Sequence, residues 1–378
     1  MGRRMNKHTI DIIGVLVIIV LIIGFLGFQL KGSQNNVSKE VQIGVLLPLT
    51  GNAAYYGEAS RRGIEIAKEE IQKSYPDFKL NIVYEDTQYT VQGGVAAYKK
   101  IQNTENIDAV ITAASQVSLA VLPLTTQDNL LQMAIFSSTN KYSSPNDLSY
   151  RVSTKNDIEV SAIVEVIKKQ EFKTLAIVYI NNDFGVGIKD ALQKQLARSV
   201  DIVAEEAFLP EENDFRTLLI KIKSKKPEAI FMVGTAVSYG LILKQARELD
   251  IKTQFISTRS AEDPVLLQQP QEITNGLIYA YPFDGTKQTK EVKNFIKEFQ
   301  KKYETVPDAY AAEGYEGFKL TVLAIKDCGR EKECIQTYFK NTKEYNSLFG
   351  PLSFDINGDV TYPFFLKMVR DGQFVPLN

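Results

Sequence analysis

The sequence contains no tryptophan, two cysteines and a single histidine, His8, among 378 residues. Lysine and arginine number 44 against 45 aspartates and glutamates, and no long basic stripe is present. This balance gives no electrostatic case for binding nucleic acid. The sequence shows no nucleophile paired with a base and no complete phosphate-binding or dinucleotide-binding glycine pattern. Neither an enzyme nor a bound cofactor is therefore expected.

The two cysteines, Cys328 and Cys334, are six positions apart. In an oxidising compartment such a pair can form a local disulfide that closes a small loop between two helices, and two free thiols are the alternative. A metal site is disfavoured, because the only histidine is predicted to lie on the other side of a membrane.

One long apolar run stands near the N-terminus, at residues 12–30. As a helix its 19 residues span roughly 28 Å, close to the hydrocarbon thickness of a bilayer. Three basic residues precede the run and only Lys31 directly follows it. The positive-inside bias therefore predicts a cytoplasmic N-terminus at 1–11, a transmembrane anchor at 12–30, a polar tether at 31–40 and an extracytoplasmic remainder. A cleaved signal peptide is the alternative, although no Ala-x-Ala pattern follows the run.

Beyond the tether, short apolar runs alternate with segments whose apolar residues have helical spacing. Runs such as 175–178 and 229–233 lack the period-two alternation of half-exposed strands. Uniform runs of this kind are typical of parallel strands that helices cover on both faces. The sequence therefore predicts an α/β fold with doubly wound parallel sheets, two of them given the chain length.

Polar and small residues recur directly after the predicted strands. In open parallel sheets, ligands bind beyond the carboxyl ends of the strands, where loops lead into helix N-termini. Hydroxyls, amides and backbone N–H groups there suit a carboxylate or another small anion, although the same residue types also cap helices and form turns. The segments concerned are 50–57, 112–116, 137–140, 181–185, 234–236 and 257–260.

The segment Val-Gln-Ile-Gly-Val-Leu-Leu-Pro-Leu-Thr-Gly-Asn-Ala-Ala-Tyr-Tyr-Gly at 41–57 resembles the opening of leucine/isoleucine/valine-type periplasmic binding proteins, the type I solute-binding components of ABC transporters. The resemblance covers 41–370, and the ordered set of motifs makes it specific. The further motifs are Arg-Arg-Gly-Ile-Glu-Ile-Ala (61–67), Val-Tyr-Glu-Asp-Thr (83–87), Tyr-Ile-Asn-Asn-Asp-Phe-Gly-Val-Gly (179–187), Gln-Ala-Arg-Glu-Leu (245–249), Pro-Asp-Ala-Tyr-Ala-Ala-Glu-Gly-Tyr-Glu (307–316) and Gly-Pro-Leu-Ser-Phe-Asp-Ile-Asn-Gly-Asp (350–359).

The resemblance implies two lobes joined by a three-segment hinge that closes on a small-molecule ligand, which a membrane permease then receives. Lobe one would comprise 41–154 plus 282–348, and lobe two 155–281 plus 349–378. The implied binding residues follow the strands of both lobes. They are Tyr55, Tyr56, Ser115, Gln116, Ser138, Thr139 and Asn140 from lobe one, and Phe184, Thr235 and Arg259 from lobe two.

Arg259 departs from the family pattern, because an acidic residue that pairs with the ligand's amino group is usual at this position. A buried guanidinium favours planar anions, and bidentate pairing with a carboxylate is its best geometry. We therefore expect a ligand that has an extra carboxylate or lacks the amine. The alternatives are that Arg259 points to solvent, or that Glu262 or Asp263 neutralises it.

A membrane-anchored solute-binding protein that delivers an amino acid or a related carboxylate or amide to an ABC transporter permease is the predicted function. A ligand-sensing ectodomain is the alternative, since the same fold also serves receptors. Sensing would need a separate membrane signalling partner, because only about eleven residues are predicted inside the cell.

Overall fold

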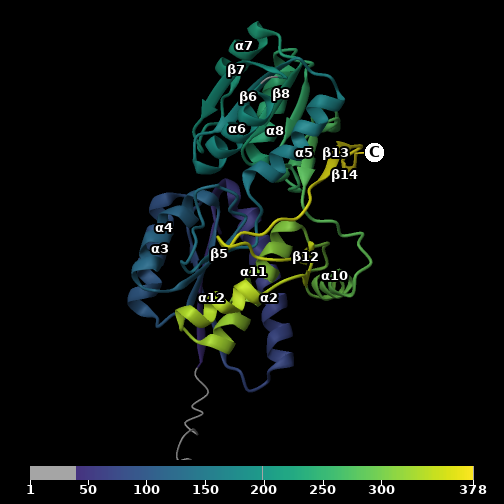
Figure 1. The fold of residues 1–378 in the computed structure, drawn as a ribbon. Helices are drawn as coiled ribbons and strands as arrows, with labels where there is room; N and C mark the ends of the chain where they lie inside the picture. The colour runs from purple at the N-terminus through teal and green to yellow at the C-terminus, as the bar shows by residue number, and fades with distance from the viewer. Residues whose placement is uncertain (1–39, 198, 378) are drawn as a thin grey trace, which may run out of the picture.

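The computed structural model describes residues 40–197 and 199–377 and shows two α/β lobes, one above the other in Figure 1. Lobe 1 is built on a five-stranded sheet and lobe 2 on a seven-stranded sheet. Three segments connect the lobes, 152–155, 282–289 and 353–364. The anchor predicted at 12–30 lies outside the described residues. Within them, none of the helices combines the length and apolar character that crossing a bilayer requires.

The sheet of lobe 1 is parallel throughout, with the strand order β2-β1-β3-β4-β5. Strands β3 and β4 are buried along their whole length, as expected for strands covered on both faces. The strands are β1 Val41–Leu47, β2 Leu80–Asp86, β3 Ala109–Ala113, β4 Leu131–Ile135 and β5 Ser149–Arg151.

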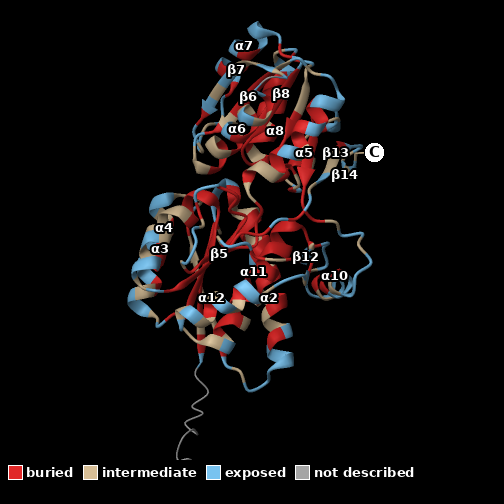
Figure 2. Ribbon diagram, viewed as in Figure 1, coloured by how far each residue is buried: buried red, intermediate tan, exposed pale blue. Residues whose placement is uncertain are grey.

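Helices cover both faces of this sheet, and Figure 2 shows their buried sides turned toward it. Helices α3 (Val91–Thr104) and α4 (Ser115–Gln127) contact one another and strands β1 to β4. On the other face, α2 (Ala54–Ser74) and α11 (Ala309–Cys328) pack very closely. A Cβ on Gly63 of α2 would lie 1.9 Å from the carbonyl oxygen of Ala311, so only glycine allows this approach. The remaining elements of lobe 1 are η1 Gly51–Ala53, α10 Lys290–Tyr303, α12 Lys332–Asn341, β11 Tyr345–Ser347 and β12 Gly350–Leu352.

The sheet of lobe 2 has the order β14-β13-β10-β9-β8-β6-β7. Five of its strands are parallel, whereas β13 and β14 join the edge as an antiparallel hairpin. The strands are β6 Thr174–Ile180, β7 Asp201–Phe208, β8 Ala229–Val233, β9 Gln254–Ser257, β10 Ile278–Tyr281, β13 Phe365–Arg370 and β14 Gln373–Pro376. The helices are α5 Asn156–Lys169, α6 Asp183–Leu196, α7 Arg216–Lys225, α8 Ala236–Glu248, α9 Gln271–Thr274, η2 Arg259–Ala261 and η3 Leu266–Gln268.

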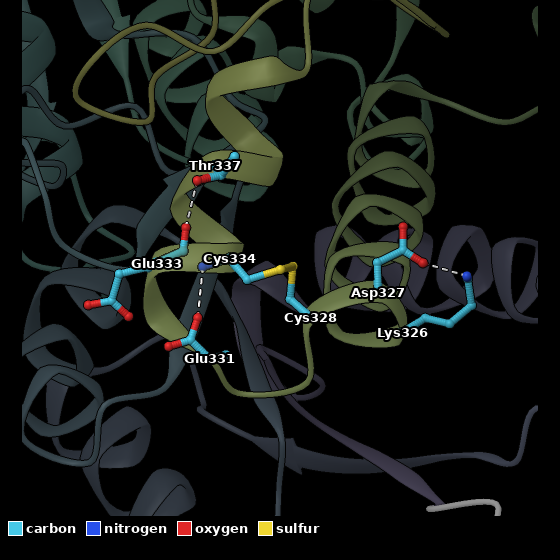
Figure 3. Close-up of a disulfide and its surroundings, with 7 residues drawn as sticks. All are labelled: Lys326, Asp327, Cys328, Glu331, Glu333, Cys334 and Thr337. Carbon is cyan, nitrogen blue, oxygen red and sulfur yellow. Dashed lines mark hydrogen bonds and ion pairs between the residues drawn. A yellow bond between two sulfur atoms is a disulfide. The ribbon is translucent and has the colours of Figure 1, made fainter. Parts of the chain in front are cut away.

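The predicted α/β fold with parallel sheets is confirmed, and the structure adds the antiparallel hairpin. The third connection lies beyond the predicted boundary at 348/349, because β12 pairs with β11 inside lobe 1. A disulfide joins Cys328, the last residue of α11, to Cys334 in the first turn of α12 (Figure 3). It therefore ties two helices of lobe 1 together.

Candidate functional site

A small cavity lies where the two lobes meet. Its volume is about 20 Å³, which is room for roughly one water molecule. Six of its residues follow the carboxyl ends of strands, as expected for a ligand site in open parallel sheets. Lobe 1 contributes Tyr56, Tyr89, Ser115, Phe136 and Tyr310, and lobe 2 contributes Phe184, Arg259 and Ser260.

Four of the ten predicted residues line this cavity, namely Tyr56, Ser115, Phe184 and Arg259. The Tyr56 hydroxyl bridges the lobes, because it accepts a hydrogen bond from the backbone N–H of Ala236 at 2.9 Å and donates to the carbonyl of Ser260 at 3.1 Å. Tyr56 belongs to α2, whereas both partners belong to lobe 2. The cavity is therefore closed by a direct contact between the lobes.

Three more predicted residues are buried directly behind the cavity wall. The backbone N–H of Thr139 donates to the Ser115 Oγ at 3.3 Å, which ties the loop after β4 to the start of α4. The Gln116 amide donates to the carbonyl oxygen of Tyr89 at 3.0 Å. The Oγ of Ser138 is buried and has no hydrogen-bond partner among the described residues. These groups shape the wall rather than line the cavity.

The structure does not bring Tyr55, Asn140 and Thr235 to this cavity. Tyr55 lines a separate pocket of about 610 Å³ together with Asp308. Asn140 is exposed, and its amide donates to Asp157 at 3.4 Å. Thr235 is the N-cap of α8 and forms a reciprocal capping box with Ser238. The position of Thr235 is therefore accounted for by helix capping, the alternative given for residues that follow strands.

Four lining residues are absent from the predicted set, Tyr89, Phe136, Ser260 and Tyr310, although Ser260 belongs to the candidate segment 257–260. The rings of Tyr56, Phe136 and Tyr310 form one cluster, with centroid distances of 4.5 Å between the two tyrosines and 5.5 Å between Phe136 and Tyr310. Tyr89 and Phe136 have positive φ angles of 61° and 30°, an uncommon conformation for aromatic residues. Phe136 follows β4 directly, so its position after a predicted strand could have identified it as a candidate binding residue.

Arg259 is 4% exposed and lines the cavity, so it does not point to solvent. Its Nη1 donates to Oε1 of Glu313 at 2.5 Å, and its guanidinium carbon lies 5.6 Å from the centre of the Tyr310 ring. Burial lowers the pKa of Arg259, but Glu313, Tyr310, Glu159 and Tyr362 together raise it more, so the net shift is upward. Glu262 instead pairs with Lys367 at 2.6 Å. The residue that neutralises Arg259 is therefore Glu313, from the other lobe.

Glu159 of α5 is a second carboxyl group beside Arg259. It is 1% exposed, and its Oε1 accepts the backbone N–H of Arg259 at 2.8 Å. Its Oε2 has no hydrogen-bond partner among the described residues. Burial raises the pKa of Glu159 to about 7, against the opposing effect of the Arg259 guanidinium. Near neutral pH this group therefore carries a proton in part of the molecules.

Raising the pH from about 4.5 to about 7 is expected to lower the free energy of unfolding through Glu159. The folded state keeps the proton over this range, whereas the unfolded state releases it, so the loss reaches at most about 3 kcal/mol. The measurement is chemical unfolding of wild type and Glu159→Gln from pH 4.5 to 8. The variant should lose less stability over this range. Equal slopes in the two proteins would contradict the assignment.

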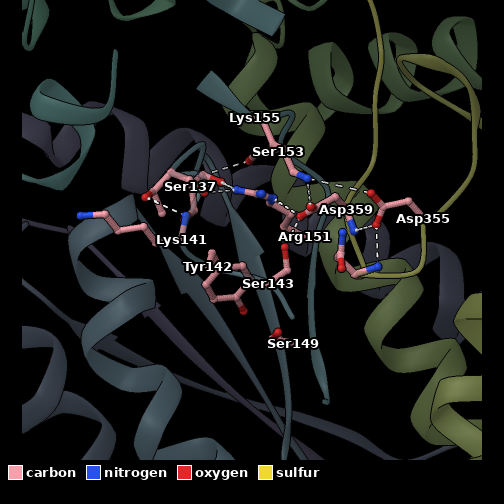
Figure 4. Close-up of polar contacts among 12 residues, drawn as sticks. Ser137, Lys141, Tyr142, Ser143, Ser149, Arg151, Ser153, Lys155, Asp355 and Asp359 are labelled. Carbon is pink, nitrogen blue, oxygen red and sulfur yellow. Dashed lines mark hydrogen bonds and ion pairs between the residues drawn. The ribbon is translucent and has the colours of Figure 1, made fainter. Parts of the chain in front are cut away.

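A buried ion pair supports the loop that carries Ser138 and Thr139 (Figure 4). Arg151 is fully buried, and its Nε donates to Oδ1 of Asp359 at 2.6 Å. Its Nη1 donates to the carbonyl oxygens of Ser137 and Thr139 at 3.2 and 2.6 Å. Arg151 thus links the loop after β4 to the connection 353–364 between the lobes.

The sequence model of the periplasmic binding protein family matches residues 40–373. The Leu/Ile/Val-binding protein BraC3 of Rhizobium johnstonii is 25% identical over 331 residues, 85% of this chain and 89% of that protein. The chain therefore belongs to the type I periplasmic binding proteins, of the kind that serves branched-chain amino acid ABC transporters. Members of this family are binding proteins of transporters, not enzymes.

Solved structures show the same fold. The leucine-binding protein LivK of Thermotoga maritima has a TM-score of 0.83 and 23% identity, covering 89% of this chain and 98% of that one. A solute-binding protein of an ABC transporter from R. palustris, solved with benzoate, has a TM-score of 0.79 and 19% identity, covering 89% and 95%. These similar proteins thus include one named for an amino acid and one holding an aromatic carboxylate.

Within the described residues, no group of three or more histidine, cysteine, aspartate or glutamate side chains is arranged to hold a metal ion. The chemistry available at the cavity is therefore that of hydrogen bonds, one guanidinium and aromatic rings. Such a set can bind and orient a small planar anion.

Proposed function

We propose that the protein is an extracytoplasmic solute-binding protein that captures a small carboxylate between its lobes and delivers it to an ABC transporter permease. The observation that carries the proposal is the convergence of Ser115, Phe184 and Arg259 from both lobes on one cavity. Arg259 stands there in place of an acid, which favours a ligand without an amine or with an extra carboxylate. The five aromatic rings around it favour a flat or apolar body.

Ligand entry requires the lobes to separate. The cavity of about 20 Å³ is far smaller than the roughly 150 Å³ that accommodates benzene. The three connecting segments are the natural hinge, because they alone link the two sheets along the described chain. A ligand that contacts both lobes then favours a closed form, which is the form that presents both lobe surfaces to a permease.

The hydrophobic segment at 12–30 is proposed to anchor the protein in the membrane, with residues 1–11 in the cytoplasm. Its length and the excess of basic residues before it support this orientation. Anchoring raises the effective concentration of the binding lobes near the permease, which matters most for a weakly bound ligand.

A thermal-shift panel on the full-length protein in detergent tests the proposed function. Benzoate, glutarate and leucine represent an aromatic carboxylate, a dicarboxylate and a neutral amino acid. A ligand at about 100 times its Kd adds about 2.7 kcal/mol of stability, which should raise Tm by several degrees. We expect shifts with benzoate or glutarate. A shift with leucine alone would reject the proposal that the ligand lacks an amine or has an extra carboxylate. No shift with any of the three compounds would count against small-carboxylate capture.

A further inference from the structure

One carboxylate, that of Glu313, connects both lobes at the centre of the molecule. Glu313 lies on α11 and is fully buried. Its Oε2 accepts the backbone N–H of Phe136 at 2.5 Å and the Ser153 hydroxyl at 2.7 Å. Its Oε1 accepts the Tyr362 hydroxyl at 2.9 Å and Nη1 of Arg259 at 2.5 Å. Four donors therefore converge on two oxygen atoms.

Only one of these four donors belongs to lobe 2. Phe136 follows β4 in lobe 1, and Ser153 and Tyr362 lie in two of the segments that connect the lobes. Arg259 follows β9 and is carried by lobe 2. When the lobes separate, Glu313 can keep the hydrogen bond from its own lobe, whereas the pair with Arg259 must break. The ion pair is thus specific to the closed form.

The closed form described here has no room for a small carboxylate beside Arg259, since the cavity measures about 20 Å³. The guanidinium that a ligand would contact is already paired with a carboxylate of the protein itself. A charge-assisted hydrogen bond in a buried place is among the stronger polar contacts. It can therefore favour closure without any ligand.

We propose that Glu313 substitutes for the ligand carboxylate on Arg259 and holds the lobes closed while the site is empty. This inference rests on the proposed function, because it names the competitor that a carboxylate ligand must displace. A protein that is mostly closed when empty binds its ligand with an apparent affinity reduced by the fraction of open molecules. Glu313 would then determine that the ligand must be an anion, and it would also determine the apparent affinity for that ligand.

Glu313→Gln is the informative variant, because an amide cannot accept from all four donors. The single amide oxygen of glutamine can accept a hydrogen bond either from the N–H of Phe136 or from Arg259. The NH₂ group then faces the other of these two donors, with which it cannot form a hydrogen bond. The Phe136 N–H is fixed in lobe 1, and Ser153 and Tyr362 can rotate their hydroxyls. The substitution should therefore weaken the contact with Arg259 and preserve the loop.

Glu316→Gln is the matched control. Glu316 lies one turn away on α11 and is 1% exposed. Its Oε1 accepts the backbone N–H of Leu348 at 2.7 Å, a contact within lobe 1. It thus reproduces the loss of a buried carboxylate on the same helix without touching the contact between the lobes.

The experiment measures the distance between the lobes in the full-length protein without ligand. Spin labels are placed on cysteines substituted for Gln92 in α3 and Glu211 in lobe 2, both exposed. The two native cysteines form the disulfide, so the introduced thiols react selectively. Double electron–electron resonance is recorded for the labelled parent, Glu313→Gln, Glu316→Gln and Arg259→Met, each checked for folding by circular dichroism.

We expect a short, narrow distance distribution for the parent and for Glu316→Gln, and a longer, broader one for Glu313→Gln and Arg259→Met. Arg259→Met keeps the inference testable if Glu313→Gln does not fold. A parent that is already open, an unchanged Arg259→Met distribution or equal opening in Glu316→Gln would overturn the inference. Because no ligand is added, these outcomes are independent of the panel that tests the proposed function.

Discussion

Asp359→Ala is expected to lower the free energy of unfolding by about 3–5 kcal/mol, because it leaves the buried Arg151 guanidinium without its counter-charge. Burial raises the pKa of Asp359, but Arg151, together with hydrogen bonds from Lys155 and Ser143, lowers it by more, so the net shift is downward. The carboxylate is therefore ionised at neutral pH, and its Oδ2 also accepts from Lys155 Nζ at 2.5 Å. The measurement is urea unfolding of the full-length protein at pH 7.

Glu69→Ala is the matched control, since it removes a surface ion pair with Lys302 at 2.8 Å. Exposed pairs of this kind contribute under about 1 kcal/mol. Asp359→Ala should also weaken ligand binding, because Arg151 holds the carbonyl oxygens of Ser137 and Thr139. Equal losses of stability in the two variants would show that the ion pair at Arg151 has no special role.

The fold could be predicted where local sequence carries the information. Uniform apolar runs predicted β6 and β8 because strands buried on both faces have no need of polar residues. The hairpin of β13 and β14 was not predicted, since its strands are mostly exposed or half-buried and lack a uniform apolar run. Strand β13 pairs with β10, more than eighty positions earlier in the chain. Strand pairing between segments so far apart in the chain cannot be predicted from a local sequence pattern.

The same distinction applies to the site. Ser115, Phe184 and Arg259 could be found because each lies near the carboxyl end of a strand, where parallel sheets bind ligands. Tyr310 and Glu313 could not be found in this way, because they lie on α11. Their role depends on the close packing of α11 against α2 at Gly63, which brings them to the centre.

Arg259 illustrates both what the sequence could predict about the site and what it could not. It was predicted to lie near the cleft from its position after a strand, and in the structure it follows β9 and lines the cavity. Its neutralising residue was sought three or four positions along the chain, at Glu262 and Asp263, and was found 54 positions away at Glu313. A buried ion pair between lobes has no preferred sequence spacing, so only the folded arrangement identifies it.

Arg259→Ala is expected to reduce the affinity for the carboxylate that raises Tm in the thermal-shift panel by at least about 30-fold. Truncating one partner of a buried, hydrogen-bonded charge pair costs about 2–5 kcal/mol, and each 1.4 kcal/mol is tenfold in Kd. The measurement is isothermal titration calorimetry at pH 7. Arg259→Lys keeps the charge but loses the planar fork, so its affinity should fall between those of wild type and Arg259→Ala.

Glu313→Gln should change the affinity for the same carboxylate in the opposite direction, by about tenfold, because the ligand no longer competes with an internal carboxylate. The opposite signs separate two roles that a loss of affinity alone would confuse. If Arg259 only supported the fold, both variants would weaken binding together, since both break the same ion pair. Weakening by Arg259→Ala together with strengthening by Glu313→Gln is the result that a direct contact between Arg259 and the ligand requires.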